Sequence, residues 1–327
     1  MNNKIKKFGL PALGTILIIT LMAGVSELLG DREIIFPEIA ALAVGYLCAP
    51  ARKWQVNSKR LFLLISGCAV LGFAISMWMP GSLYVKLIAA FAAAQVIYLF
   101  SGTSLAPLIS AVVLPVLIGT RSVSYILSAA SMTLLVILFH HLLVRRGIRA
   151  EEPFVPKKGP DASAALRLVL RTTLFALLLV PALRSGMQFV VAPPLLVAFT
   201  DWSEADKHEA LTDGLPKIGI LALCALIGAG SRLILTITLG LPLFAAAAAA
   251  SIVMILLLIR TGIFLPPAGA LTLLAMLIPE SAVLLYPVEV TAGVIVFYLA
   301  ASAMTRVRYN GTVPVIYNTR NTRHVDM

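Results

Sequence analysis

Residues 264–281 read FLPPAGALTLLAMLIPES, an apolar stretch with a proline pair near its start and a third proline near its end. Proline inside a helix costs about 3 kcal/mol, because it removes a backbone N–H bond and clashes with the preceding turn. We therefore interpret the stretch as a short helix that begins at its proline pair.

The composition of the whole chain is that of a membrane protein. Of its 327 residues 60% are hydrophobic and only 13% are charged, and the mean hydropathy is +0.96. A soluble domain has about a quarter of its residues charged. Apolar runs recur at about the 20 residues that a helix needs to cross a bilayer. The sequence predicts an all-α, polytopic membrane protein.

Breaks at glycine, proline and charged clusters divide the chain into about twelve transmembrane segments. They lie near 9–29, 34–50, 61–79, 83–100, 104–119, 122–144, 166–183, 187–200, 217–235, 241–259, 263–279 and 283–304. We predict a first six-helix repeat over 1–150, a cytoplasmic linker over 151–165, a second repeat over 166–305 and a cytoplasmic tail over 306–327. Six crossings per copy make the two repeats parallel.

The basic residues predict how these segments are oriented. If the N-terminus is inside and every segment crosses, 21 of the 26 lysines and arginines lie on the inner side, since only five lie outside: Arg32, Lys86, Arg121, Arg184 and Arg232. Cytoplasmic loops carry such an excess. We expect a multi-pass protein of the inner (plasma) membrane with both termini in the cytoplasm. The net charge of +11 is explained by these short loops, so no nucleic-acid partner is expected.

The two halves can be superposed on each other. A shift of 157 residues places LISGCAVLGFA (64–74) on LALCALIGAGS (221–231). A shift of 160 places SLAPLISAVVLPVLIG (104–119) on FLPPAGALTLLAMLIP (264–279), with Pro107 on Pro267. The counterpart of the opening stretch is therefore the fifth segment.

Short segments with proline, in corresponding places of two halves, are the best sequence indication of a transport site. The second, fifth, eighth and eleventh segments have this form. Helix N-termini favour anions, so we expect the N–H groups of Ala268, Gly269 and Ala270 to be free for a ligand. The predicted substrate-binding residues here are Thr103, Ser104, Pro107, Pro266, Pro267 and Gly269, although the prolines can instead merely kink packed helices and Gly269 can serve close packing.

Charged residues in apolar segments are a second set of candidates. Arg121 and Arg184 could attract an anion, while Glu38 and Glu289 could pair with them or relay a proton. The alternative is that such side chains reach the membrane interface. Glu38 and Glu289 have short side chains within their segments, so they fit this alternative least.

No enzyme, cofactor or metal is predicted. The sequence has no Walker lysine motif, no HExxH and no GxSxG, and its three cysteines have no metal-ligand spacing.

Residues 259–279, IRTGIFLPPAGALTLLAMLIP, lead to a resemblance. Together with APPLLVAF (192–199) and VRYN (307–310), they resemble the HPP family of integral membrane proteins over roughly 187–310. In that family a histidine precedes the proline pair, whereas this chain has Leu265 there. The resemblance implies movement of small anions across the membrane.

A second resemblance competes with the first. LRLVLRTTLFALLLV (166–180) followed by APPLLVAF is similar to fusaric-acid-resistance-type exporters of aromatic acids. We therefore expect a secondary transporter or permease for a small anion, with an aromatic-acid exporter as one alternative. The runs AAFAAA (89–94) and AAAAAA (245–250) favour another, a membrane scaffold or assembly subunit, and they leave a homo-oligomer open.

Overall fold

The computed structural model describes residues 2–150, 152–157, 159, 161–204 and 214–310, with side chains from residue 9 to residue 305. The elements in these ranges are all helical. Eight of the described helices are long and apolar enough to cross a membrane. They are α1 (Asn2–Leu29), α3 (Ser58–Trp78), α4 (Leu83–Phe100), α6 (Ser124–Arg145), α7 (Ala162–Arg184), α10 (Gly214–Ser231) with its π-helical extension η4 (Arg232–Thr238), α11 (Leu243–Thr261) and α14 (Tyr286–Asn310). The prediction of a helical membrane protein is confirmed.

The remaining four predicted segments form short helices. They are α2 (Glu38–Ala43), which continues as the π-helix η2 (Val44–Cys48), and α5 (Pro107–Ile118), α8 (Pro193–Glu204) and α12 (Pro266–Leu277). α5, α8 and α12 have 12 residues each. At about 1.5 Å per residue, such a helix spans about 18 Å of a hydrocarbon core that is about 30 Å thick. Twelve full crossings therefore stay a prediction. Smaller elements are η1 (Arg32–Ile34), η3 (Gln188–Val191) and α13 (Glu280–Val283).

Proline marks the start of each short helix. Pro107, Pro193 and Pro266 are the first residues of α5, α8 and α12, and Pro37 directly precedes α2. A proline at the first helical position loses nothing, since the N–H there has no partner within the helix. These prolines therefore begin helices rather than kink them.

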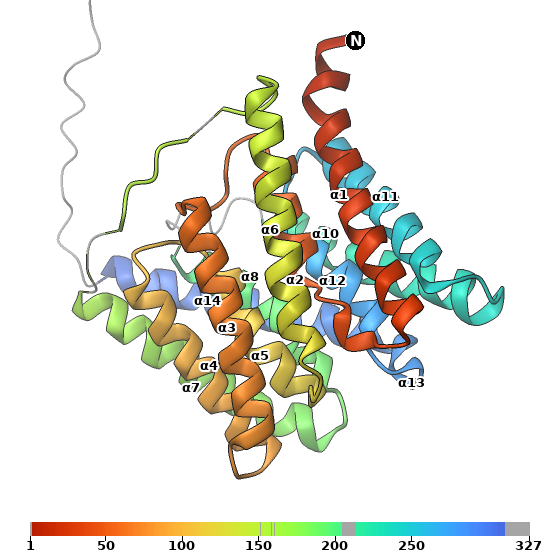
Figure 1. The fold of residues 1–327 in the computed structure, drawn as a ribbon. Coiled ribbons are helices and arrows are strands. Elements are labelled where there is room, and N and C mark those ends of the chain that lie inside the picture. Colours follow the sequence, from red (N-terminus) through yellow and green to blue (C-terminus); the bar gives the residue numbers. More distant parts are fainter. Residues whose placement is uncertain (1, 151, 158, 160, 205–213, 311–327) are drawn as a thin grey trace, which may run out of the picture.

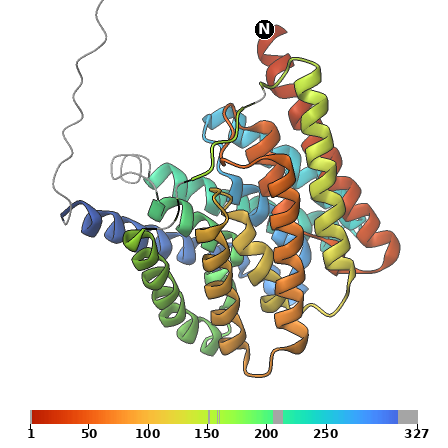
Figure 2. The same ribbon diagram turned by 60° about the vertical axis from the view of Figure 1, so that its left-hand side comes forward.

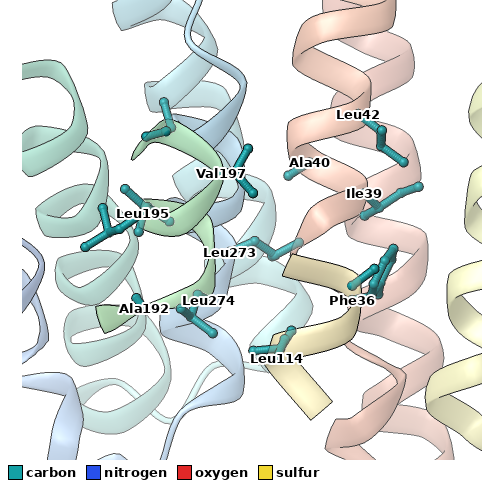
Figure 3. Packing of buried hydrophobic residues seen from close by; sticks show 14 of the residues in the cluster. Phe36, Ile39, Ala40, Leu42, Leu114, Ala192, Leu195, Val197, Leu273 and Leu274 are labelled. Atoms are coloured by element: carbon teal, nitrogen blue, oxygen red, sulfur yellow. The ribbon is translucent and has the colours of Figure 1, made fainter. Parts of the chain in front are cut away.

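The short helices lie at the centre of the molecule, and the long helices surround them (Figure 1; Figure 2). All residues of α2 and α12 are buried. Figure 3 shows Leu273 of α12 pointing toward α2, with Leu114 of α5 beside them. The long helices turn side chains such as Leu17, Leu63 and Leu177 outward. An apolar exterior around a protein-covered centre suits a lipid environment, where short helices cannot meet lipid with open ends.

Contacts between helices of the two halves occur in matching pairs. α1 packs against α11, and α7 packs against α4; α2 packs against α12, and α8 packs against α5 (Figure 1). The hydroxyl of Tyr125 donates to the carbonyl of Ala111 over 3.1 Å, and that of Tyr286 donates to the carbonyl of Leu271 over 2.7 Å. The two halves thus share both helix neighbours and a buried hydrogen bond.

Two glycines mark another contact that occurs in both halves. A Cβ atom added to Gly72 would lie 2.4 Å from the carbonyl oxygen of Val112, and one added to Gly228 would lie 2.2 Å from that of Thr272. Both glycines allow a helix backbone to approach closely. They are separated by 156 residues, one fewer than the shift of 157 that places LISGCAVLGFA on LALCALIGAGS. The repeat and its register stay a prediction.

The loops gather at two ends, as alternate crossing requires. At one end Ser104 accepts a bond from the N–H of Gln55 over 2.8 Å, and the N–H of Lys157 donates to Gly102 over 2.9 Å. At the other end the N–H of Leu243 donates to Glu27 over 3.0 Å. We call these the inner and outer ends after the charge prediction. Which end faces the cytoplasm stays a prediction.

Candidate functional site

A chamber of about 470 Å³ opens at the inner end, where the two halves meet. Its apolar wall consists of the start of α12 and the loop before it. The loop before α5 contributes Ser104 and α4 contributes Tyr98, while α8 contributes residues of its last two turns. The chamber therefore lies against three of the four short helices or the loops that lead into them.

Charged side chains from four segments line this chamber. They are the lysines Lys53, Lys157 and Lys217 and the acids Asp201 and Glu204. Glu204 is held by two arginines of α7, since Arg171 donates to it and Arg167 contacts it over 3.1 Å. Asp201 accepts a hydrogen bond from the Trp54 side chain. With both acids engaged by protein groups, the balance of charge around the chamber is positive, which favours an anionic ligand.

Arg171 anchors the wall of the chamber from inside the protein. Its side chain is 2% exposed, and it donates to Ser203 over 2.8 Å and to Gln95 over 2.9 Å as well as to Glu204. Gln95 in turn donates to Thr200 over 3.0 Å. A buried arginine whose donors are satisfied in this way fixes α4, α7 and α8 to one another.

The start of α12 does not offer the free N–H groups that we expected. Pro266 and Pro267 occupy the first two helical positions and have no N–H, and the N–H of Ala268 donates to Leu265 over 3.0 Å. The expectation was wrong for Ala268, because the proline pair closes the first turn with a three-residue hydrogen bond. At this end of α12 only the helix dipole would attract an anion, and Pro266 and Pro267 form part of the chamber wall.

Gly269 lies against α2 rather than at the chamber surface. A Cβ atom at Gly269 would lie 2.6 Å from the carbonyl oxygen of Ala40. This contact supports the alternative interpretation of Gly269, which is close packing between helices.

Glu38 is 1% exposed and accepts a hydrogen bond from Ser110, in the first turn of α5. Its second carboxylate oxygen, Oε2, has no hydrogen-bond partner among the described residues. Glu38 therefore lies deep among the short helices, without either arginine with which we expected it to pair.

Glu289, Arg121 and Arg184 are outside the chamber lining. Glu289 of α14 is 3% exposed and accepts a bond of 2.8 Å from the N–H of Phe189. Arg121 and Arg184 are exposed at the outer end, where the N–H of Arg121 donates to Glu33 over 3.1 Å. Thr103 is buried beside the chamber loop and bonds with Ser101 over 2.8 Å. Pro107 is the first residue of α5. Three of the predicted residues line the chamber: Ser104, Pro266 and Pro267.

Sequence reasoning missed the three lysines, Asp201 and Glu204 as site residues. Their loops and helix ends look like ordinary cytoplasmic charge in the sequence, and no spacing between them signals that they meet. Comparison with protein-family models, with curated proteins and with solved structures finds no match for this chain.

Proposed function

We propose that this protein is a secondary transporter or permease for a small anion, and that its ligand enters the inner-end chamber. The observation that carries the proposal is the position of this chamber: it lies between the two halves, against short helices that cannot span a bilayer, and it is edged by Lys53, Lys157 and Lys217. Transport sites are typically formed where broken helices of two repeats meet. Three cations at such a place favour a negatively charged substrate.

The proposal includes an internal repeat of six helices, placed in parallel copies. Its support is the paired hydrogen bonds of Tyr125 and Tyr286, the paired glycine contacts of Gly72 and Gly228, and the matching helix neighbours. Resemblance to the HPP family agrees with small-anion movement. We further propose the inner (plasma) membrane as the location, with both termini in the cytoplasm.

Export of aromatic acids is a second candidate, favoured by one observation. Tyr98, Trp202 and Phe264 also line the chamber, so it offers aromatic surface next to the lysines. Aromatic surface suits an organic anion with an apolar body better than an inorganic anion.

A scaffold role has less support. It was motivated by runs of small residues, but Ala90 and Ala94 of α4 and Ala246, Ala247 and Ala250 of α11 are buried inside the molecule. α11 packs against α1, α10 and α12. Three of the six residues of each run are thus used within the chain, which weakens the argument for a partner helix.

Reconstituted full-length protein tests the function directly. We expect counterflow of radiolabelled nitrate or benzoate in proteoliposomes, with a preference for benzoate if the aromatic candidate is correct. Empty liposomes and a Lys53→Glu/Lys157→Glu double variant serve as controls. Equal fluxes in wild-type, variant and empty liposomes for a panel of inorganic and aromatic anions would count against transport.

A further inference from the structure

We propose that Glu38 is a proton-binding residue that couples proton movement to anion transport through the inner-end chamber. This inference rests on the proposed transport function and adds a coupling ion and the residue that carries it.

The placement of Glu38 puts it next to the chamber but outside its lining. Glu38 contacts Ser110, which is three residues from the start of α5, and its neighbour Ala40 contacts Gly269, which is three residues from the start of α12. The residues that precede or begin these two helices, Ser104 and Pro266, line the chamber. Three residues correspond to about 4.5 Å along a helix. Glu38 is therefore about one helical turn from the chamber.

The surroundings of Glu38 do not neutralise a negative charge. Within the described residues no lysine, arginine or histidine forms an ion pair with it. The elements packed against α2 carry few ionisable side chains, and neither α5 nor α12 has any. Among the side chains that the structure describes, they are Glu27 of α1, Tyr46 and Cys48 of η2, and Tyr125, His140, His141 and Arg145 of α6. Of these, Tyr125 is close enough to interact with the carboxyl group.

Proton uptake resolves the charge at this position. A buried carboxylate without a cation is strongly unfavourable, so the carboxyl group is stable here when it carries a proton. Ser110 donates to Oε1 of this group, and Oε2 has no hydrogen-bond partner among the described residues. Within the described part of the chain, the carboxyl group of Glu38 therefore has neither a paired cation nor a hydrogen bond to Oε2. Such a group is suited to gain or lose a proton when the short helices move.

In the proposed repeat, the corresponding position of the second half has no such group. α8 begins with Pro193, Pro194 and Leu195 where α2 begins with Glu38, and Ala270 of α12 corresponds to Ser110 at the shift of 160 that relates Ala111 to Leu271. Apolar residues thus occupy the positions in the second half that correspond to Glu38 and Ser110. Glu38 and Ser110 in the first half carry a desolvation cost that packing does not require. Such a cost is expected where a group serves a function.

Infrared titration of the full-length protein in lipid nanodiscs tests proton binding without a substrate. We expect a carbonyl stretching band of a buried, protonated carboxyl group that is lost reversibly as the pH is raised. The band should be absent in Glu38→Gln and shifted in Ser110→Ala, and Glu289→Gln should retain it. A wild-type spectrum without such a band, or a band that persists in Glu38→Gln, would overturn the inference.

Transport assays test coupling separately. In proteoliposomes an inward proton gradient should drive uptake of labelled nitrate or benzoate by the wild type, whereas Glu38→Gln should lose this acceleration but keep anion exchange. Anion flux that ignores the gradient in the wild type would overturn coupling while leaving the transport function intact. Wild-type protein that moves no anion in any assay would overturn the function and coupling together, whatever the infrared band shows.

Discussion

Tyr286 donates its hydroxyl hydrogen to the backbone carbonyl of Leu271 over 2.7 Å, which ties the long helix α14 to the short helix α12 at a fully buried point. Tyr125 makes the same contact with Ala111, and each tyrosine ring also meets a phenylalanine edge-on, at 5.6 Å and 5.5 Å between centroids. The short helices thus depend on hydrogen bonds from the long helices for their position.

Replacement of either tyrosine by phenylalanine should destabilise the protein by about 1 kcal/mol, because the hydrogen bond is lost while the ring contact remains. Thermal unfolding of the purified protein in mild detergent measures this. Tyr84→Phe is the control, since the Tyr84 hydroxyl is only partly buried and its bond to Ala176 is 3.3 Å long. A larger loss for the control than for Tyr286→Phe would contradict the structural role of the buried contact.

Gly269→Ala should destabilise by about 1–3 kcal/mol, because its added methyl group would lie 2.6 Å from the Ala40 carbonyl oxygen and force α12 away from α2. Gly67→Ala in α3 is a matched control, since no atom lies within 4 Å of its added Cβ. Alanine is favoured over glycine in a helix by about 0.5–1 kcal/mol, so the control should be neutral or stabilising. Opposite signs in thermal unfolding are expected, and equal shifts would argue against close packing at Gly269.

Lys53→Gln and Lys157→Gln should each weaken anion binding about threefold to tenfold, because each removes a cation from the edge of the chamber. Raised salt should weaken wild-type binding in the same direction. Ligand-induced thermal shifts with benzoate and nitrate provide the measurement. Lys59→Gln changes an exposed inner-end lysine that is outside the chamber, so binding to this variant should equal that of the wild type.

Arg171→Gln should cost about 1–3 kcal/mol, because the buried Gln95 would lose its charged partner and Glu204 would keep only Arg167. Arg167→Gln should cost at most about 1 kcal/mol, since that side chain is 15% exposed and its loss leaves Arg171 on Glu204. Unfolding of both variants in the same detergent gives the comparison. An equal loss of stability in the two variants would contradict the anchoring role of Arg171.

Stability should fall on acidification partly through Asp31, which lies outside the membrane-spanning helices. Burial works against ionisation of Asp31, but hydrogen bonds from Ser124, the Glu33 N–H and Ser122 outweigh it and hold the pKa of this carboxyl below its usual value. A lowered pKa stabilises the fold above the pKa of the unfolded chain, and this contribution is lost as the pH falls through the folded value. The difference in melting temperature between wild type and Asp31→Asn should therefore shrink in acid; a difference independent of pH would contradict it.

The candidate site was predictable only in part. Proline spacing located the short helices, and it led to Ser104, Pro266 and Pro267, which line the chamber. The three lysines, Asp201 and Glu204 were not found, because they come from loops and helix ends far apart in the chain that meet only after folding. The proline pair also removed the backbone donors that a helix start ordinarily offers, a local effect that the helix-dipole argument overlooked.

The sequence by itself determined the membrane class and the position of the long helices, since hydrophobic length is a local property; the predicted segment 83–100 coincides with α4. It also determined where the short helices begin, because proline fixes the backbone within a few residues. The tertiary structure alone decided what these helices surround and which charges they bring together. Burial of Glu38 beside Ser110, contact of Gly269 with Ala40 and closure of the chamber all depend on packing between distant segments, for which apolar sequence carries little register information.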